Sequence, residues 1–300
     1  MIPSKLLPCP LCSNADVKVY LDEEDQRLGP STLGPSRIDV SPGRILRCQG
    51  CGFAFRQMRP GDEELSELYR ELDGKAYYSE FQGRSKTALR HLKIVHRYLS
   101  PGYILDVGCA SGEFLHCAAD AGWKTVGVEP SEALCEKARE VLAGRGELIC
   151  ATLEKACLPV SSFDAVTLWD VLEHVPRPLR FMRMCGSLLR PGGHLFVNVP
   201  DLDSLPARVF GARWPLFLAE HLNYFNQESL RLCGELARLN FLHFGRRLAS
   251  FSIDYLLHRL AQHHIPGASF GHRLASRCGI SRTVVPLPMG ELYGVWQRSS

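Results

Sequence analysis

The sequence contains no long apolar run and carries little net charge. Its 300 residues include no stretch of about 18 consecutive apolar side chains, so a helix that spans a bilayer is not expected. The formal net charge is only +3, which is too small to indicate a nucleic-acid or a membrane surface. The first residues, MIPSKLLPCPLC, lack the apolar core of a signal peptide. We therefore expect a cytoplasmic protein with neither a membrane span nor a nucleic-acid partner.

Internal repeats and low-complexity tracts are also absent, and the composition is that of a globular protein. Hydrophobic residues make up 45% of the chain, and the length suits one large domain with or without a small module. Twelve cysteines are present. Four of them form two tight pairs, and the others are scattered through segments that read as buried. This pattern is typical of a reducing compartment, with one metal site and ordinary core thiols.

Short apolar segments alternate with amphipathic ones from residue 101 onwards. This rhythm predicts a mostly parallel sheet of seven strands covered by helices on both faces, which is the doubly wound, Rossmann-like α/β fold. The predicted strands are Tyr103–Val107, Thr125–Glu129, Glu147–Cys150, Ala165–Trp169, His194–Val199, Leu242–Ala249 and Glu291–Gln297. The predicted helices are Glu113–Ala121, Ser131–Ala143, Pro178–Leu189, Glu228–Leu239 and Ile253–His263.

The first hundred residues differ from the rest. Residues 1–60 hold the paired cysteines, and the polar stretch from Asp22 to Gly43 reads as a long loop or a hairpin tip. Residues 61–100 read as a helical cap with two helices, one at 62–72 with Asp62 as its N-cap and one at 85–99. The second helix is expected to place Leu89, Leu92, Val95, His96 and Leu99 on one face. The chain thus divides into a small module at 1–60, a cap at 61–100 and a main domain at 101–300.

A glycine-containing loop follows the first strand of the main domain. It runs Asp106-Val107-Gly108-Cys109-Ala110-Ser111-Gly112 and then enters a helix. Glycines let the backbone approach a ligand closely, and the helix start offers unpaired N–H groups to a carboxylate. Asp106 can accept a hydrogen bond from a cationic amine. The methionine end of S-adenosylmethionine (SAM) presents such a carboxylate beside an ammonium group, so the loop predicts a SAM site.

A second acid, Glu129, ends the next strand, 23 positions after Asp106. A carboxylate there can accept hydrogen bonds from both ribose hydroxyls. Dinucleotide-binding proteins share this logic, but their fingerprint is G-x-G-x-x-G, with glycines that make room for a pyrophosphate. Here the loop reads D-x-G-x-x-x-G, with one glycine fewer and an acid where a pyrophosphate would be repelled. The pattern therefore favours SAM over a dinucleotide.

Five segments together resemble the class I SAM-dependent methyltransferases, and more narrowly the bacterial branch known as methyltransferase domain 23. They are DVGCASGEFL, VGVEPSEALCEKAR, LPVSSFDAVTLWDVLEHVPRP, LLRPGGHLFVNVPD and VPLPMGELYGVWQRS, within residues 85–300. The resemblance implies that Asp106, Gly108 and Gly112 hold the methionine moiety and that Glu129 follows the second strand as the ribose ligand. It also implies that Thr152 and Leu153 cradle adenine, although many relatives carry Asp in place of Thr152.

The remaining predicted cofactor residues lie in the same group of loops. Asp170 ends the fourth strand and faces the sulfonium side of the pocket in the family. Cys109 and Pro130 complete the predicted cofactor site. Cys109 is not expected to act as a nucleophile.

Two histidines follow strands of the sheet at positions where chemistry is expected. Methyl transfer is an in-line displacement, and a base is needed when the acceptor must lose a proton. His174 follows the fourth strand, and the pair Glu220-His221 lies in the loop-rich stretch after the fifth. The zinc-ribbon sugar C-methyltransferases resemble this layout, which makes His221 the predicted general base with Glu220, His174 and Tyr78 as helpers. His174 has an alternative role in packing or capping, because Glu-His-Val recurs in this fold with many substrates.

The paired cysteines have the spacing of a structural zinc site. Cys9 and Cys12 form one C-x-x-C knuckle, and Cys48 and Cys51 form the other. Four thiolates complete a tetrahedral Zn²⁺ shell with no open position, and such a site helps to fold a module too small for its own core. A redox dithiol and an iron–sulfur cluster are the alternatives, although the first usually needs only one C-x-x-C.

The resemblance implies an enzyme that transfers methyl from SAM to a small-molecule acceptor. A nucleotide-linked sugar and a precursor of a surface polysaccharide or secondary metabolite are the expected classes. Two alternatives stay open, namely a methyltransferase whose zinc ribbon docks a protein or RNA, and a SAM-binding protein without catalysis. The docking alternative predicts a basic, aromatic face on the ribbon from Arg44, Arg47, Arg56, Arg59, Phe53 and Phe55, where the competing interpretation is a solvated hairpin edge.

Overall fold

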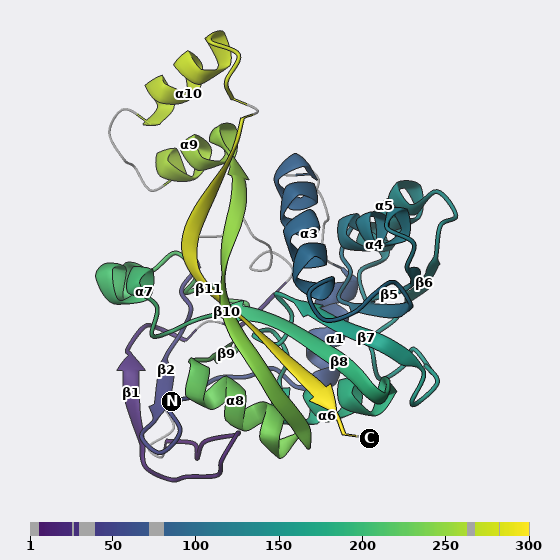
Figure 1. The fold of residues 1–300 in the computed structure, drawn as a ribbon. Coiled ribbons are helices and arrows are strands. Elements are labelled where there is room, and N and C mark those ends of the chain that lie inside the picture. The colour runs from purple at the N-terminus through teal and green to yellow at the C-terminus, as the bar shows by residue number, and fades with distance from the viewer. Residues whose placement is uncertain are drawn as a thin grey trace.

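A seven-stranded sheet forms the centre of the molecule (Figure 1). The computed structural model describes residues 6–25, 27–29, 40–71, 81–262, 268–281 and 283–299. The strand order is β10-β11-β8-β7-β4-β5-β6, and all neighbours run parallel except that β11 is antiparallel to both β8 and β10. The strands are β4 (Tyr103–Val107), β5 (Lys124–Glu129), β6 (Glu147–Cys150), β7 (Phe163–Trp169), β8 (Leu189–Pro200), β10 (Leu239–Ser252) and β11 (Val284–Arg298). The predicted Rossmann-like, mostly parallel sheet is confirmed.

Helices cover both faces of this sheet because alternate strand residues are apolar on both sides. In β4, Ile104 packs in a cluster with residues of α3 and α4, whereas Leu105 packs in a second cluster with residues of α6 and α8. Strands buried on both faces read as continuous apolar runs, which is why the sequence located most of them. The helices are α3 (Phe81–Val95), α4 (Glu113–Asp120), α5 (Glu132–Leu142), α6 (Pro178–Leu188) and α8 (Gln227–Leu236).

A second, smaller sheet joins the N-terminal module to the main domain. Its order is β1-β2-β3-β9, with β1 (Val17–Leu21), β2 (Ile45–Cys48) and β3 (Ala54–Arg56) from the module. The fourth strand, β9 (Asn223–Tyr224), comes from the loop-rich stretch after β8 and pairs with Ala54 and Phe55. The division at residue 60 stays a prediction, but a strand of the main domain completes the sheet of the module.

Strands β10 and β11 form a long antiparallel ribbon that extends beyond the central sheet (Figure 1). Helices α9 (Ile253–Gln262) and α10 (Ala268–Arg277) lie at its far end. The sequence predicted only the halves of these strands nearest the core and missed α10 and α7 (Leu205–Phe210), because their exposed residues lack a clear apolar period. In the described part of the chain, no helix is long and apolar enough to cross a membrane.

Three details of the predicted helices are wrong. Helix α1 (Asp62–Arg70) is capped by Gly61, and Asp62 is its first helical residue. On α3, Leu89 is 50% exposed and the helix ends before His96, so the buried face instead contains His91. A polar residue on an apolar face hides the helical period. The segment Arg190-Pro191-Gly192-Gly193, expected to separate α6 from the fifth strand, already belongs to β8.

Candidate functional site

A cavity of about 1200 Å³ opens at the carboxyl ends of β4, β5, β6 and β7. Open α/β sheets bind their ligands at this edge. Helix α1 and the base of the β10–β11 ribbon contribute further walls. Among the predicted cofactor residues, Gly108, Glu129, Pro130, Thr152, Leu153 and Asp170 line the cavity. Asp106, Cys109 and Gly112 are absent from that lining and support the wall from behind.

The two glycines of the β4–α4 loop are fixed by backbone conformation and by packing. Gly108 has φ +71° and Gly112 has φ +83°, in the left-handed region that disfavours side chains. A Cβ on Gly108 would lie 2.7 Å from Val171 Cγ2, and one on Gly112 would lie 3.3 Å from the Ala138 Cα. The loop therefore holds one tight shape at the start of α4, where unpaired N–H groups face the cavity side.

Asp106 is a buried carboxyl group at the end of β4. Its Oδ1 accepts a 2.6 Å hydrogen bond from the Thr167 hydroxyl, and only 3% of the residue is exposed. Burial raises the pKa of Asp106 to about 7, the Thr167 bond lowers it, and the nearby Glu129 carboxylate raises it further. A cationic ligand beside this carboxyl group would stabilise its ionised form.

Glu129 shapes the neighbouring loop while it lines the cavity. Its Oε2 accepts the Ala110 N–H at 3.0 Å, and its Oε1 accepts the Ser131 N–H at 2.9 Å. Burial raises the pKa of Glu129 to about 7, against the lowering effect of these two bonds. Each carboxylate oxygen has a second lone pair that remains able to accept a ligand hydroxyl.

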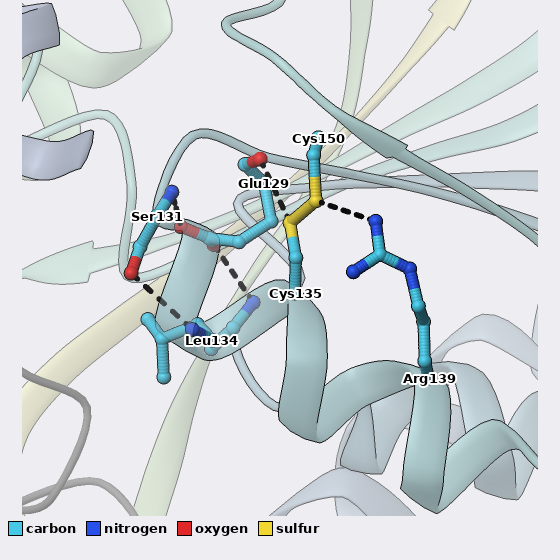
Figure 2. Close-up of a disulfide and its surroundings, with 7 residues drawn as sticks. Glu129, Ser131, Leu134, Cys135, Arg139 and Cys150 are labelled. Carbon is cyan, nitrogen blue, oxygen red and sulfur yellow. Dashed lines mark hydrogen bonds between the residues drawn. A yellow bond between two sulfur atoms is a disulfide. The ribbon is translucent and has the colours of Figure 1, made fainter.

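A disulfide joins Cys135 of α5 to Cys150 at the end of β6, beside the predicted adenine residues (Figure 2). The expectation that every cysteine outside the two pairs is an ordinary core thiol is therefore wrong for these two. Their Cα atoms lie 6.1 Å apart, because α5 packs directly on β6. Cys135 Sγ also lies 3.3 Å from the Glu129 carbonyl oxygen, and Cys150 lines the cavity next to Thr152. Sequence spacing alone gave no signal for this contact.

The predicted general base and its helper histidine meet at the other end of the same cavity. The rings of His174 and His221 lie edge to face, with centroids 4.7 Å apart. His174 Nδ1 lies 3.1 Å from the Glu220 carbonyl oxygen, and His221 Nδ1 lies 2.9 Å from the Leu216 carbonyl oxygen. A carbonyl oxygen only accepts, so both rings carry their proton on Nδ1 and keep a lone pair on Nε2.

Both imidazoles are neutral at neutral pH. Burial lowers the pKa of His174 to about 4, although the bond to Glu220 opposes this shift. Burial also lowers the pKa of His221 well below its usual value, and the neighbouring His174 adds to that effect. Glu220 lines the cavity, while Tyr78 lies outside the described residues. Tyr69 of α1, which the sequence did not single out, contacts the His174 ring edge-on at 6.1 Å.

A buried ionic network lies between the two ends of the cavity. Arg247 of β10 pairs with Asp170 at 3.1 Å and with Glu291 of β11, and its Nη1 lies 2.8 Å from His91 Nε2. The His91 ring in turn stacks on Trp169 at 3.9 Å. Asp170, expected on the sulfonium side, thus lines the cavity while it is held by the ribbon. No motif connects β10 to β7, so the sequence could not predict this network.

The four paired cysteines converge in the N-terminal module. Their sulfur atoms all lie within 4.8 Å of one another, and all four are free of disulfides. Cys9 Sγ lies 3.7 Å from Cys51 Sγ, and Cys12 Sγ lies 3.6 Å from Cys48 Sγ. A tetrahedron of thiolates around Zn²⁺, with bonds of about 2.3 Å, has sulfur–sulfur edges of about 3.8 Å. The arrangement fits a structural zinc ion.

Arginines of the module turn inward instead of forming a basic face. Arg56 is 1% exposed and donates to the Ala219 carbonyl, and Arg59 donates to the Pro176 and Leu222 carbonyls. Arg47 pairs with Asp203, and Arg44 pairs with Asp22. Phe53 and Phe55 are buried as well. The basic, aromatic docking face that the ribbon alternative predicts is therefore not formed.

Residues 81–243, more than half of the chain, match a family described as a methyltransferase domain. The chain is 35% identical over 99 residues to a ubiquinone biosynthesis O-methyltransferase of Coxiella burnetii, a match that covers 32% of this chain and 42% of that protein. A protein of the same name from Xanthomonas campestris is 35% identical over 119 residues, covering 38% of this chain and 49% of that protein. The matches thus span less than half the length of these curated relatives.

A solved structure supports the fold. A putative methyltransferase from Bacillus halodurans superposes with a TM-score of 0.52 at 16% identity, over 71% of this chain and 99% of that chain. At this identity the likeness shows the Rossmann-like α/β methyltransferase architecture and nothing about the acceptor.

Proposed function

Because the chain belongs to the methyltransferase domain family and is a SAM-dependent methyltransferase, we propose that it methylates a small molecule bound beside His174 and His221. One observation carries this proposal. A single cavity is lined at one end by Gly108 and Glu129 and at the other by the two histidines. A donor at the first end and an acceptor at the second can therefore meet inside one enclosed space.

The cofactor end fits SAM in charge as well as in shape. SAM supplies a methyl group on a sulfonium and also carries an ammonium group. Asp106 and Glu129 are two buried carboxyl groups whose pKa values burial raises to about 7, and a cationic ligand offsets that cost. In the proposed site Asp106, Gly108, Cys109 and Gly112 surround the methionine end through the loop. Glu129 and Pro130 hold the ribose, and Thr152 and Leu153 contact adenine.

His221 is the proposed proton acceptor. Its Nδ1–H is fixed on the Leu216 carbonyl, which orients the ring and leaves Nε2 with a lone pair at the cavity wall. His174 and Glu220 are proposed to position it, because the His174 ring contacts His221 and the Glu220 carbonyl orients His174. Tyr78 is proposed as a further helper, by resemblance alone. The cavity is deep enough that water exclusion at this end would favour proton transfer.

The acceptor class is proposed from the whole layout. A zinc module together with a Glu-His pair favours a sugar-like acceptor, such as a nucleotide-linked sugar or a precursor of a surface polysaccharide or secondary metabolite. The curated relatives are named for O-methylation in ubiquinone biosynthesis, which supports an oxygen acceptor. Since the arginines of the module are engaged inside the fold, docking of RNA or an acidic protein loses its structural support.

Zinc in the four-cysteine cluster is proposed as a structural ion. The sulfur–sulfur distances of 3.6 and 3.7 Å match the edges of a thiolate tetrahedron. The closed shell leaves no position for a substrate, so the cluster would stabilise the module without taking part in methyl transfer.

The proposed function is tested with trideuteromethyl-SAM and fractionated metabolites. Wild-type protein should produce a small molecule with the mass shift of one trideuteromethyl group. The His221→Gln variant should bind SAM normally but turn over about 10²- to 10⁴-fold more slowly, because a positioned base contributes that much. The exposed His243→Gln is the matched control. Label found only in protein or RNA would refute a small-molecule acceptor, and undiminished turnover by His221→Gln would refute the base.

A further inference from the structure

Three potential metal ligands meet at the acceptor end of the cavity. Glu173 and His174 follow β7, and His221 lies immediately before β9. One carboxylate oxygen and one ring nitrogen from each histidine all lie within 4.8 Å of one another. All three residues line the cavity. This cluster is separate from the four-cysteine cluster of the N-terminal module.

The hydrogen bonds of the two rings determine which nitrogen is available. Each Nδ1 lies within hydrogen-bond distance of a backbone carbonyl oxygen, at 3.1 Å for His174 and 2.9 Å for His221. The proton is therefore on Nδ1 in both rings, and the lone pair is on Nε2. Histidines that bind metals almost always donate their other N–H to a carbonyl or carboxylate in this way. Both rings are thus oriented as ligands before any ion arrives.

Glu173 provides the independent sign of a missing partner. The residue is only 1% exposed, and its Oε2 has no hydrogen-bond partner in the part of the chain that the structure describes. Its carbonyl accepts N–H groups of Leu222 at 2.8 Å and Asn223 at 3.0 Å, which fixes its backbone against the segment that carries His221. Buried polar atoms are normally satisfied, so an unpartnered carboxylate oxygen beside two free Nε2 lone pairs calls for a ligand.

We propose that Glu173, His174 and His221 bind a divalent transition-metal cation, with Zn²⁺ as the best match. Two imidazoles and one carboxylate are ligands that suit zinc, and three protein ligands leave at least one coordination position open. The open position would face the cavity that the cluster lines. Magnesium and calcium, which prefer sets of oxygen ligands, fit this donor set poorly.

The effect of this cation on turnover follows from the proposed role of His221 and rests on it. A cation bound to His221 Nε2 occupies the same lone pair that would accept the proton of the acceptor. Occupancy of the cluster should therefore inhibit methyl transfer while the SAM end of the cavity stays intact. The cluster would act as an inhibitory zinc site.

Binding is tested directly, without reference to activity. Full-length protein with zinc in the cysteine cluster is titrated with Co²⁺, followed by its visible d–d absorption, and with Zn²⁺, followed by calorimetry. We expect one further cation per chain, without the sulfur-to-cobalt charge-transfer band of a thiolate site. Glu173→Gln and His221→Gln should each weaken this binding about tenfold or more, because even losses beyond the ligand shell cost that much. The exposed His243→Gln should leave it unchanged.

The two kinds of failure can be told apart. If no second cation binds, or if both variants bind it as the wild type does, the metal site is refuted whatever the turnover. If the cation binds and inhibits, and Glu173→Gln shows a much smaller ratio of inhibited to free turnover loss, the inference stands. If the cation binds and raises turnover, the site stands but the role of His221 as base falls. Absence of any methyl transfer would refute the proposed function and leave the binding result untouched.

Discussion

Two buried carboxyl groups, Asp106 and Glu129, show most clearly how single residues make the cofactor site. Both lie at carboxyl ends of neighbouring parallel strands, and both are at most 5% exposed. Such burial is costly for a charge unless it is hydrogen-bonded or paired. Glu129 is bonded to two backbone N–H groups, whereas Asp106 has one hydroxyl partner. The site is therefore prepared for a cation, and most urgently at Asp106.

Replacing Asp106 by Asn should weaken SAM binding about 10- to 100-fold. The substitution keeps the size of the side chain and its contact with Thr167 but removes the negative charge, and hydrogen bonds to charged groups contribute about 1.5–3 kcal/mol. Isothermal titration with SAM measures the effect. Glu147→Gln, at an exposed position of β6, is the matched control. Equal affinities for Asp106→Asn and wild type would contradict the assignment.

The pKa shifts of the same two acids predict how SAM stabilises the protein at different pH values. Both folded-state pKa values are raised to about 7, above those of the unfolded chain, so the apoprotein loses stability as pH rises from about 4 to 7. A cationic ligand prefers the ionised carboxylates. The rise in unfolding temperature caused by SAM should therefore grow between pH 6 and pH 8, as thermal unfolding with and without SAM can measure.

In Asp106→Asn this growth with pH should be much smaller, because one of the two titrating groups is gone. A rise in unfolding temperature that is the same at pH 6 and pH 8 in the wild type would contradict the shifted pKa values.

At the residue scale, the sequence predicted what local chemistry dictates. The glycines, the two acids and the four cysteines have roles set by conformation, charge or metal preference, and their spacing along the chain carries the signal. The ionic network of Arg247, Asp170 and Glu291 and its contact with His91 come from four separate segments. Such contacts depend on tertiary packing, which no spacing in one sequence reveals.

At the scale of elements, buried parallel strands were predictable and the peripheral ones were not. Strands β4 and β6 have the predicted bounds, because apolar runs flanked by turns define them. Strand β9 has only two residues and exists because β3 offers an edge to Asn223 and Tyr224. Its conformation is dictated by a partner more than 160 positions away, so its own sequence carries no period.

The disulfide between α5 and β6 should stabilise the oxidised protein. It closes a loop with a sequence separation of 15 residues, for which chain entropy predicts a contribution of about 3 kcal/mol. Cys150→Ser should lower the free energy of unfolding in urea by about that amount under oxidising conditions, and the difference should shrink in reductant. Cys278→Ser, at an exposed free cysteine, should change little. Free thiols at Cys135 and Cys150 in air-oxidised wild type would contradict the pairing.

At the scale of the whole molecule, the two ends of the chain are joined through one loop. The loop that carries Glu220 and His221 leads directly into β9, which completes the sheet of the module. Arg59, just after β3, donates to the Pro176 and Leu222 carbonyls and to Asn223 Oδ1, so it spans the loops that follow β7 and precede β9. The module therefore holds the acceptor end of the cavity, although its cysteines lie outside the lining.

Loss of the proposed structural zinc should impair the acceptor end and spare the cofactor end. In Cys12→Ser the metal shell is incomplete, and β2 and β3 lose the ion that fixes their connecting turn. Because β3 pairs with β9, the His221 loop should become mobile. Glu129 and the β4–α4 loop are anchored in the central sheet and should remain in place.

We therefore expect Cys12→Ser to contain less than about one zinc per chain, to unfold at a lower temperature and to turn over much more slowly, with SAM affinity close to that of the wild type. Metal analysis, thermal unfolding, labelled-SAM turnover and calorimetry measure the four quantities, with Cys278→Ser as the matched control. Wild-type protein without zinc would refute the metal centre itself. Normal turnover by a zinc-free variant would show instead that the acceptor end is held independently of the module, against the shared sheet.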